Sequence, residues 1–237
     1  MTMIKTNESG RSMIEMLGVL AIIGVLSVGG IAGYSKAMNK FKTNKVADNV
    51  SMLVANIKTM YAQQNTYNGL ENSTAVSMGV VPDELVVKDS NGNYSSLANA
   101  FNGEVEIHTA GSTTATDKTA NTTQDDKAFV IFFGGLSREA CITLATNDWG
   151  SGYSSGLIAM SASGTSAKAD KERVDSVLIG DEGTQQKPNS TGKTDGIPYA
   201  IATPGGKNLS VPMMVTQAAS ACSCKTGNKC SITWKYY

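Results

Sequence analysis

The sequence is poor in the residues on which most catalytic and metal sites depend. Its 237 residues include a single histidine, His108, which lies in a predicted strand with no serine or cysteine elbow nearby. A lone histidine in such a place is usually structural or solvated. Neither a P-loop nor a G-x-G-x-x-G motif occurs. We therefore expect a protein that is not an enzyme and that holds no cofactor.

A calcium site is also disfavoured. The segment 89–93, Asp-Ser-Asn-Gly-Asn, resembles the start of an EF-hand loop. It lacks the glycine at position six and the glutamate at position twelve that such a loop requires. We interpret the segment as a turn and expect no metal ligands there.

The chain has no surplus of charge of either sign. Lys and Arg number 20, and Asp and Glu also number 20. This balance gives no support to a nucleic-acid partner and excludes an acidic solvating tail. Apolar residues make up 41% of the chain, and one long run near the start accounts for part of them. The remainder is a moderately polar soluble domain with ample material for a core.

One stretch contains no charge at all, between Glu15 and Lys36. At the helical rise of 1.5 Å per residue, about 20 residues span roughly 30 Å, the thickness of a bilayer core. A Sec signal peptide is the less favoured interpretation, because its apolar region is shorter and ends in an A-x-A-like site. A carboxylate at the rim of such a run, Glu15, is costly in hydrocarbon and needs a partner. A plain anchor has no reason to keep it.

The helix is predicted to continue beyond the apolar run to about Gln64. One apolar stripe recurs at steps of four, three, four and three residues, formed by Val46, Val50, Leu53, Ile57 and Met60. No proline interrupts the segment. A helix of about 54 residues would be about 80 Å long, which suits a stalk rather than an isolated globule. We expect the stripe to pack against the protein's own head.

The rest of the chain predicts a head of mixed helices and strands. Alternating or dense apolar patterns predict strands at 105–107, 129–133, 157–160, 174–179, 197–202 and 231–237. The last of these alternates polar and apolar residues, which predicts a half-buried strand that closes the sheet. Ser137 is a predicted helix cap, and 211–221 is predicted to form a second helix. Polar loops are expected at 109–127 and 181–196, and a loop containing a short helix at 65–82.

Four cysteines follow the apolar run, at Cys141, Cys222, Cys224 and Cys230. An even number in a domain that faces an oxidising compartment predicts two disulfides. A zinc site is disfavoured, because the spacing lacks C-x2-C and the chain has only one histidine. Cys222 and Cys224 are too close in the chain to pair without strain. Two pairings of the four cysteines remain open.

Several of these features resemble a known family. A short polar leader ending in Gly10, with Glu15 as the fifth residue after it, resembles the class III leader of type IV pilins. Tyr-x-Gly-Leu at 67–70, Gly-x-x-Pro at 79–82 and the segment 100–107 are similar to the stem-to-head junction of type IVb pilins. Leu-Ser-x-x-x-Cys-x-x-Leu at 136–144 resembles their head. The resemblance covers the N-terminal third well and returns near Cys141.

The resemblance implies an α+β fold, in which a long N-terminal helical stem packs on an antiparallel β-sheet head. It divides the chain into a cleaved leader (1–10), a transmembrane or filament-core half of the stem helix (11–35) and an amphipathic half (36–64). A globular head follows (65–237), with a disulfide-bounded region at 141–230. The implied function is that of a structural subunit which polymerises through its N-terminal helix into a type IV pilus.

The family also assigns roles to single residues. By resemblance, a prepilin peptidase cuts between Gly10 and Arg11 and methylates the new N-terminus at Arg11. Glu15 then neutralises the N-terminal amine of a neighbouring subunit during assembly. Arg11 departs from the pattern, since the family usually has Phe or Met there. Its guanidinium has an alternative partner in Glu15 of the same helix, although this order of charges is the weaker one.

The family's long-range bridge favours the pair Cys141 and Cys222, with Cys224 and Cys230 closing a small turn. Cys141–Cys224 with Cys222–Cys230 is the other pairing that remains possible.

The implied partners are further copies of the chain in a helical homopolymer, the prepilin peptidase and the inner-membrane pilus assembly machinery. The implied location is the inner membrane as prepilin and then the extracellular pilus of a Gram-negative-type bacterium. Two alternatives stay open. One is a pseudopilin of a type II secretion system or a minor pilin, with the same leader and stem. The other is a membrane-anchored periplasmic binding module, which would keep its leader and tolerate Glu15→Ala.

Overall fold

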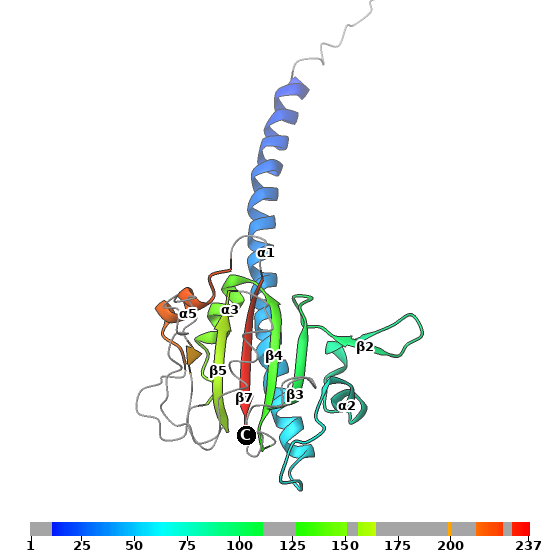
Figure 1. Ribbon diagram of the computed structural model, residues 1–237. Helices are drawn as coiled ribbons and strands as arrows, with labels where there is room; N and C mark the ends of the chain where they lie inside the picture. Colours follow the sequence, from blue (N-terminus) through cyan, green and yellow to red (C-terminus); the bar gives the residue numbers. More distant parts are fainter. Residues whose placement is uncertain (1–10, 111–126, 151–155, 165–198, 201–211, 225–228) are drawn as a thin grey trace, which may run out of the picture. The chain divides into compact units, whose positions relative to one another are not determined.

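The computed structural model describes residues 11–110, 127–150, 156–164, 199–200, 212–224 and 229–237 (Figure 1). The chain divides into two compact units, Met1–Phe41 and Lys42–Tyr237. One helix, α1 (Arg11–Met60), contributes to both units. The expected segments at 174–179 and 181–196 lie outside the described residues, as does nearly all of the loop expected at 109–127.

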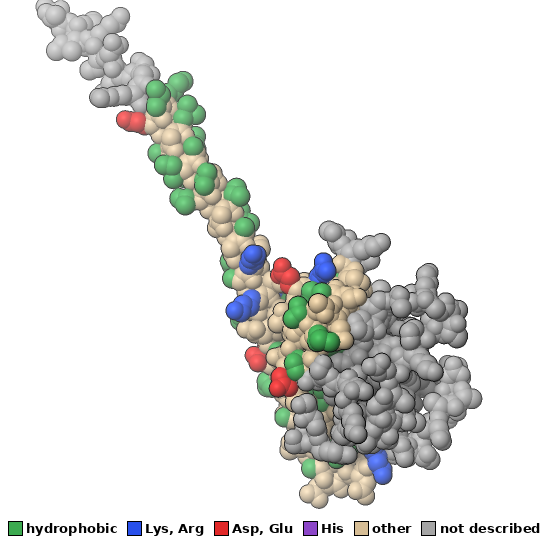
Figure 2. Space-filling model, turned by 90° about the vertical axis from the view of Figure 1, so that its left-hand side faces the viewer, with side chains coloured by type: hydrophobic (Ala, Val, Ile, Leu, Met, Phe, Trp, Pro, Cys, Tyr) green, Lys and Arg blue, Asp and Glu red, His purple; other side chains and the backbone are tan. Residues whose placement is uncertain are grey.

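The described part of the first unit is the beginning of α1. Every side chain described between Met13 and Ala37 is exposed, and the large hydrophobic ones are exposed by half to three-quarters. Figure 2 shows hydrophobic side chains covering the visible face of this part of the helix. By length and composition, α1 is able to cross a membrane.

The helix ends at Met60, four residues before the expected end at Gln64. Tyr61 still donates to the carbonyl of Ile57 at 3.0 Å, and Gln64 donates to the carbonyl of Tyr61 at 2.8 Å. The chain therefore leaves the helix through a tight turn. The cause is Tyr61, which is buried and whose ring packs 5.3 Å from that of Tyr67. This contact brings the chain back toward the sheet.

The second unit is built on a five-stranded antiparallel sheet with the order β3-β4-β7-β5-β6. Its strands are β3 (Val105–Thr109), β4 (Phe129–Leu136), β5 (Leu157–Ser163), β6 (Tyr199–Ala200) and β7 (Cys230–Tyr236). A separate hairpin pairs β1 (Val86–Lys88) with β2 (Tyr94–Leu97). The strands expected at 105–107, 129–133 and 157–160 are confirmed. Of the strand expected at 197–202, the structure describes only the two residues of β6.

The last strand differs from its prediction. The alternating pattern at 231–237 predicts a half-buried strand that closes the sheet, but β7 lies between β4 and β5. All seven of its residues are buried. Trp234 pairs with Ile131 on one side and with Met160 on the other. The prediction is wrong because alternation of polar and apolar residues predicts that the polar face is exposed to solvent, whereas Thr233 and Lys235 lie on a second face that is also buried.

The core lies between residues 42–60 of α1 and one face of the sheet. Four residues of the predicted stripe, Val46, Val50, Leu53 and Ile57, are fully buried in one cluster with the inward side chains of β4 and β7. In Figure 1 this part of α1 lies behind β4 and β7. The stripe therefore packs on the protein's own sheet, as expected. Met60 is the exception, because it is 45% exposed while the next residue, Tyr61, is buried.

The remaining helices are short. They are α2 (Asn72–Ser77), the 3-10 turn η1 (Asp83–Leu85), α3 (Arg138–Ala145) and α5 (Val215–Ala221). The predicted cap of α3 is confirmed, since the Ser137 hydroxyl accepts the N–H of Ala140 at 3.2 Å. The helix expected at 211–221 begins later, at Val215. The N–H of Met213 donates to the carbonyl of Ala145 at the end of α3, and Met214 is extended, so the helix starts only after them.

Candidate assembly segment and disulfide region

The structure places the predicted assembly residues at the start of α1. Arg11 is its first residue, and Glu15 lies four residues later; Gly10 lies outside the described residues. The Glu15 side chain is exposed, and no described side chain forms a salt bridge with it. Its carboxylate is therefore available to a positive group from another molecule.

The surroundings of Glu15 are apolar and uncovered. Met13 is 71% exposed and Ile14 is 76% exposed, and no charged residue follows Glu15 until Lys36. Soluble monomers rarely expose so large a contiguous apolar surface. At about 25 cal/mol for each Å² of apolar area removed from water, its burial is strongly favourable. The described side chains of this part of α1 are therefore suited to an apolar environment.

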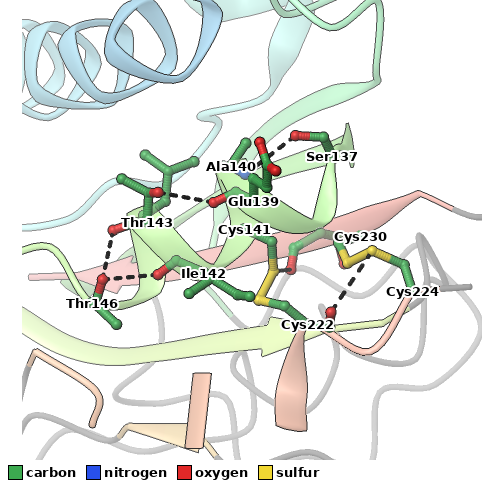
Figure 3. Close-up of a disulfide and its surroundings, with 12 residues drawn as sticks. Ser137, Glu139, Ala140, Cys141, Ile142, Thr143, Thr146, Cys222, Cys224 and Cys230 are labelled. Carbon is green, nitrogen blue, oxygen red and sulfur yellow. Dashed lines mark hydrogen bonds between the residues drawn. A yellow bond between two sulfur atoms is a disulfide. The ribbon is translucent and has the colours of Figure 1, made fainter. Parts of the chain in front are cut away.

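Both disulfides of the pairing favoured by the resemblance are present, and no cysteine is free. Cys141 of α3 pairs with Cys222, with 5.8 Å between their Cα atoms and a separation of 81 positions in the chain. Cys224 pairs with Cys230, with Cα atoms 5.5 Å apart and a separation of 6 residues. Figure 3 shows the two bridges side by side. The other pairing that the sequence left open does not occur.

The longer bridge connects elements that are far apart in the chain. Cys141 lies on α3 and Cys222 follows the last residue of α5, and both cysteines are fully buried. In the chain-entropy model, closing a loop of this length contributes about 4.5 kcal/mol, whereas the short loop contributes about 2 kcal/mol. The Sγ atom of Cys141 also lies 3.9 Å from the carbonyl oxygen of Ser231 on β7. The bridge thus joins both helices beside the central strand.

The junction pattern at 67–82 has a structural role. The Tyr67 ring lies between Tyr61, at 5.3 Å, and Phe129 of β4, at 4.8 Å between centroids. Leu70 is buried, and Gly69 and Gly79 have positive φ values of 80° and 71°. These two glycines adopt a backbone conformation that other residues rarely take. The pattern therefore belongs to the connection between α1 and the sheet, which contains the short helix α2, as the expected loop with a short helix at 65–82 predicts.

Asn72 has a structural role that no sequence motif indicates. Its side-chain amide donates to the carbonyl of Val105 at 3.2 Å and accepts the N–H of Ile107 at 2.7 Å. Farther along the same strand, the N–H of Thr109 donates to the carbonyl of Leu70 at 3.0 Å, and its hydroxyl donates to the carbonyl of Tyr67. These bonds occupy the outer edge of β3, which would otherwise present unpaired backbone groups. No local pattern reveals an asparagine that binds a strand more than 30 residues away.

The segment 100–107 contains a second contact that the pattern did not explain. Asn99 donates to the carbonyl of Gly134 at 2.8 Å and accepts the N–H groups of Phe101 and Gly103. A Cβ atom at Gly103 would overlap the backbone of Gly134 and Gly135. Glycine is required at position 103 because the two backbones touch there.

Three lysines of α1 contact the second unit's other elements. Lys45 forms a salt bridge with Glu84 at 2.8 Å, and the Lys42 ammonium lies 5.7 Å from the ring centroid of Phe101. The ammonium of Lys58 lies 5.5 Å from the ring centroid of Tyr236, and burial lowers the pKa of this lysine. Burial raises the pKa of Tyr236. These contacts hold the C-terminal half of α1 against η1, the loop before β3 and β7.

Comparison with known proteins places these features in a family. The Bundlin family model matches residues 35–184, which is more than half of the chain. The major structural subunit of the bundle-forming pilus of Escherichia coli O127:H6 is 29% identical over 146 residues, which cover 62% of this chain and 68% of the relative. A toxin coregulated pilin of Vibrio cholerae is 27% identical over 209 residues, which cover 86% of this chain and 80% of the relative.

Among solved structures, the crystal structure of TcpA, a type IV pilin from the Vibrio cholerae El Tor biotype, aligns with a TM-score of 0.46. The alignment has 20% identity and covers 83% of this chain and 99% of that chain. The family assignment rests on the sequence match to the Bundlin model. The resemblance to type IV pilins is thereby confirmed, and the chain belongs to the Bundlin family.

Proposed function

We propose that this chain is a structural subunit of a type IV pilus, which polymerises through its N-terminal helix into a surface filament. The observation that carries the proposal is the exposed apolar half of α1, with Glu15 near its start. Such a surface is stable in a bilayer or between other copies of the same helix. Its relatives are named as pilus subunits, which supports self-association as the final state.

The proposed path begins with a leader of residues 1–10. A prepilin peptidase removes it between Gly10 and Arg11 and methylates the new amine at Arg11. Residues 11–35 then hold the subunit in the inner membrane, while residues 36–64 belong to the amphipathic half of the stem and 65–237 to the head outside it. Two disulfides in the head are consistent with an oxidising compartment.

Glu15 is the proposed assembly residue. A carboxylate in an apolar environment carries a large desolvation cost unless a positive group pairs with it. The methylated amine of a neighbouring subunit supplies that group when the subunits dock in register. The inner-membrane assembly machinery would deliver each new subunit, and the filament would extend from the surface of a Gram-negative-type bacterium. Support comes from the exposure of Glu15 and from the lack of a salt bridge to it among the described residues.

Peptide and intact mass spectrometry on filaments sheared from the producing cells tests this proposal. A mature chain that begins at methylated Arg11 and is abundant in the sheared fraction is the expected result. The same processed chain confined to membranes would instead indicate a pseudopilin or a minor subunit. A chain that is still uncut at Gly10 would contradict the pilus role and leave the membrane-anchored module.

A further inference from the structure

The apolar run of α1 is followed by a cluster of aromatic and basic side chains within the first unit. Tyr34 is 67% exposed and Phe41 is 61% exposed, and Lys36 and Lys40 are both exposed as well. We call these four residues the interfacial collar. A tyrosine such as Tyr34 favours the boundary between hydrocarbon and water, because its ring is apolar and its hydroxyl stays in contact with water. Phe41 adds apolar area at the same level.

The spacing places the collar at a bilayer surface. Lys36 lies 21 positions after Glu15, which is about 32 Å along a helix, close to the thickness of a hydrocarbon core. When Glu15 lies at one surface of the hydrocarbon core, Lys36 therefore lies at the opposite surface. Lys36 and Lys40 are four residues apart, so they lie on the same side of the helix, about 6 Å from each other.

The charge around the collar is of one sign. Between Glu15 and Asp48 the helix contains no acidic residue, and neither Lys36 nor Lys40 forms a salt bridge with a described side chain. An anionic phospholipid carries a phosphodiester group at the depth of the collar, where two ammonium groups complement its charge. Long lysine side chains also reach from a helix to the headgroup region.

We propose that Lys36 and Lys40 bind the headgroup of an anionic phospholipid in the outer leaflet of the inner membrane, before the subunit joins a filament. The inference rests on the proposed membrane stage of the subunit. The lysines hold α1 at a defined depth, with the apolar run in hydrocarbon. Tyr34 and Phe41 lie on the other side of the helix and favour the same depth in the membrane.

Native mass spectrometry of the full chain in a neutral detergent tests the proposal. The chain is mixed with phosphatidylglycerol or with phosphatidylcholine of the same acyl chains, and the retained lipids are counted. We expect phosphatidylglycerol to be retained preferentially, by about fivefold for each lysine that contributes. The double variant K36Q/K40Q should lose this preference, and K36R/K40R should keep it.

The matched control is K88Q/K127Q, which removes the same number of charges from two exposed lysines of the second unit. It should retain phosphatidylglycerol as the unaltered chain does. Equal retention of the two lipids by the unaltered chain would overturn the proposal, as would an unchanged preference in K36Q/K40Q. This readout needs no filament. If the chain is absent from sheared filaments but still retains phosphatidylglycerol preferentially, the proposed pilus function is contradicted and the proposed lipid binding by the interfacial collar is supported.

Discussion

Two asparagine side chains, Asn72 and Asn99, take the place of backbone partners where the chain changes direction. Asn72 binds the outer edge of β3 through both atoms of its amide. Asn99 joins a tight turn to the carbonyl of Gly134 while it caps two N–H groups of its own loop. Each supplies a donor and an acceptor at a fixed distance, which no apolar residue of similar size can do.

Replacing Asn72 with Ala should expose the β3 edge. The variant loses two hydrogen bonds and leaves the N–H of Ile107 and the carbonyl of Val105 without this partner. We expect a loss of about 1–3 kcal/mol in the free energy of unfolding, measured by urea denaturation, and faster hydrogen exchange at the amide of Ile107. Asn93→Ala, at an exposed position of the β1–β2 turn, is the control and should change neither. Unaltered exchange at Ile107 in the Asn72 variant would contradict this role.

Gly103 offers a prediction about space rather than backbone conformation. A Cβ atom there overlaps the backbone of Gly134 and Gly135, while a Cβ atom at Gly92 meets nothing within 4 Å despite its φ of +83°. Gly103→Ala should lower the free energy of unfolding by about 2–4 kcal/mol, because two backbones must separate. Gly92→Ala should cost about 1 kcal/mol from its backbone conformation alone. Equal losses in thermal or urea unfolding would show that the contact is unimportant.

Among the elements, α3 and α5 depend on one another more than on their own sequences. α3 has a local cap at Ser137, but α5 has seven residues and no side-chain cap. A helix of that length is unstable in isolation. The bridge between Cys141 and Cys222 and the backbone bond from Met213 to Ala145 keep the two helices together.

Removing the two bridges separately should therefore have unequal effects. Cys141→Ser with Cys222→Ser should lower the free energy of unfolding by about 4.5 kcal/mol, and Cys224→Ser with Cys230→Ser by about 2 kcal/mol. The order follows from the lengths of the closed loops, 81 and 6 residues. Guanidinium titration of each double variant measures the difference. A larger loss from the shorter loop would contradict the loop-length argument.

At the scale of the whole molecule, the two units bury their apolar residues in different ways. The second unit has its own core, in which residues of α1 meet the sheet. Among its described residues, the first unit has apolar side chains but no core, and each of those between Met13 and Tyr34 is exposed. A single helix therefore contributes to a folded domain at one end, and at the other end it has the exposed apolar surface on which the proposed assembly depends.

The charges at the start of α1 should control assembly. Glu15→Gln removes the charge that the proposed amine pairs with, so we expect few or no sheared filaments, although the protein is still made and cleaved. Arg11→Phe removes a competing positive group from the same helix and should assemble at least as well as the unaltered chain. Quantifying the sheared and membrane fractions by immunoblot checks both. A clear loss of filaments in Arg11→Phe would show that the guanidinium assists assembly instead of competing with it.

The sequence by itself determined those features that depend on neighbours along the chain. The charge-free run, the stripe from Val46 to Ile57, the cap at Ser137 and the dense strand at 129–133 were all predicted, because each follows from short-range patterns of polarity or capping. The even number of cysteines predicted two bridges, and the family resemblance selected their pairing.

Only the tertiary structure decided the features that depend on partners distant in the chain. The central position of β7 follows from its pairing with β4 and β5, not from its own alternation. Tyr61 is buried in place of Met60 because the chain turns back after α1 and the Tyr67 ring packs against the Tyr61 ring. Asn72 and Gly103 acquire their roles from strands that lie about 30 residues away. Burial and edge pairing depend on which segments come into contact in the folded protein, and a local sequence pattern does not contain that information.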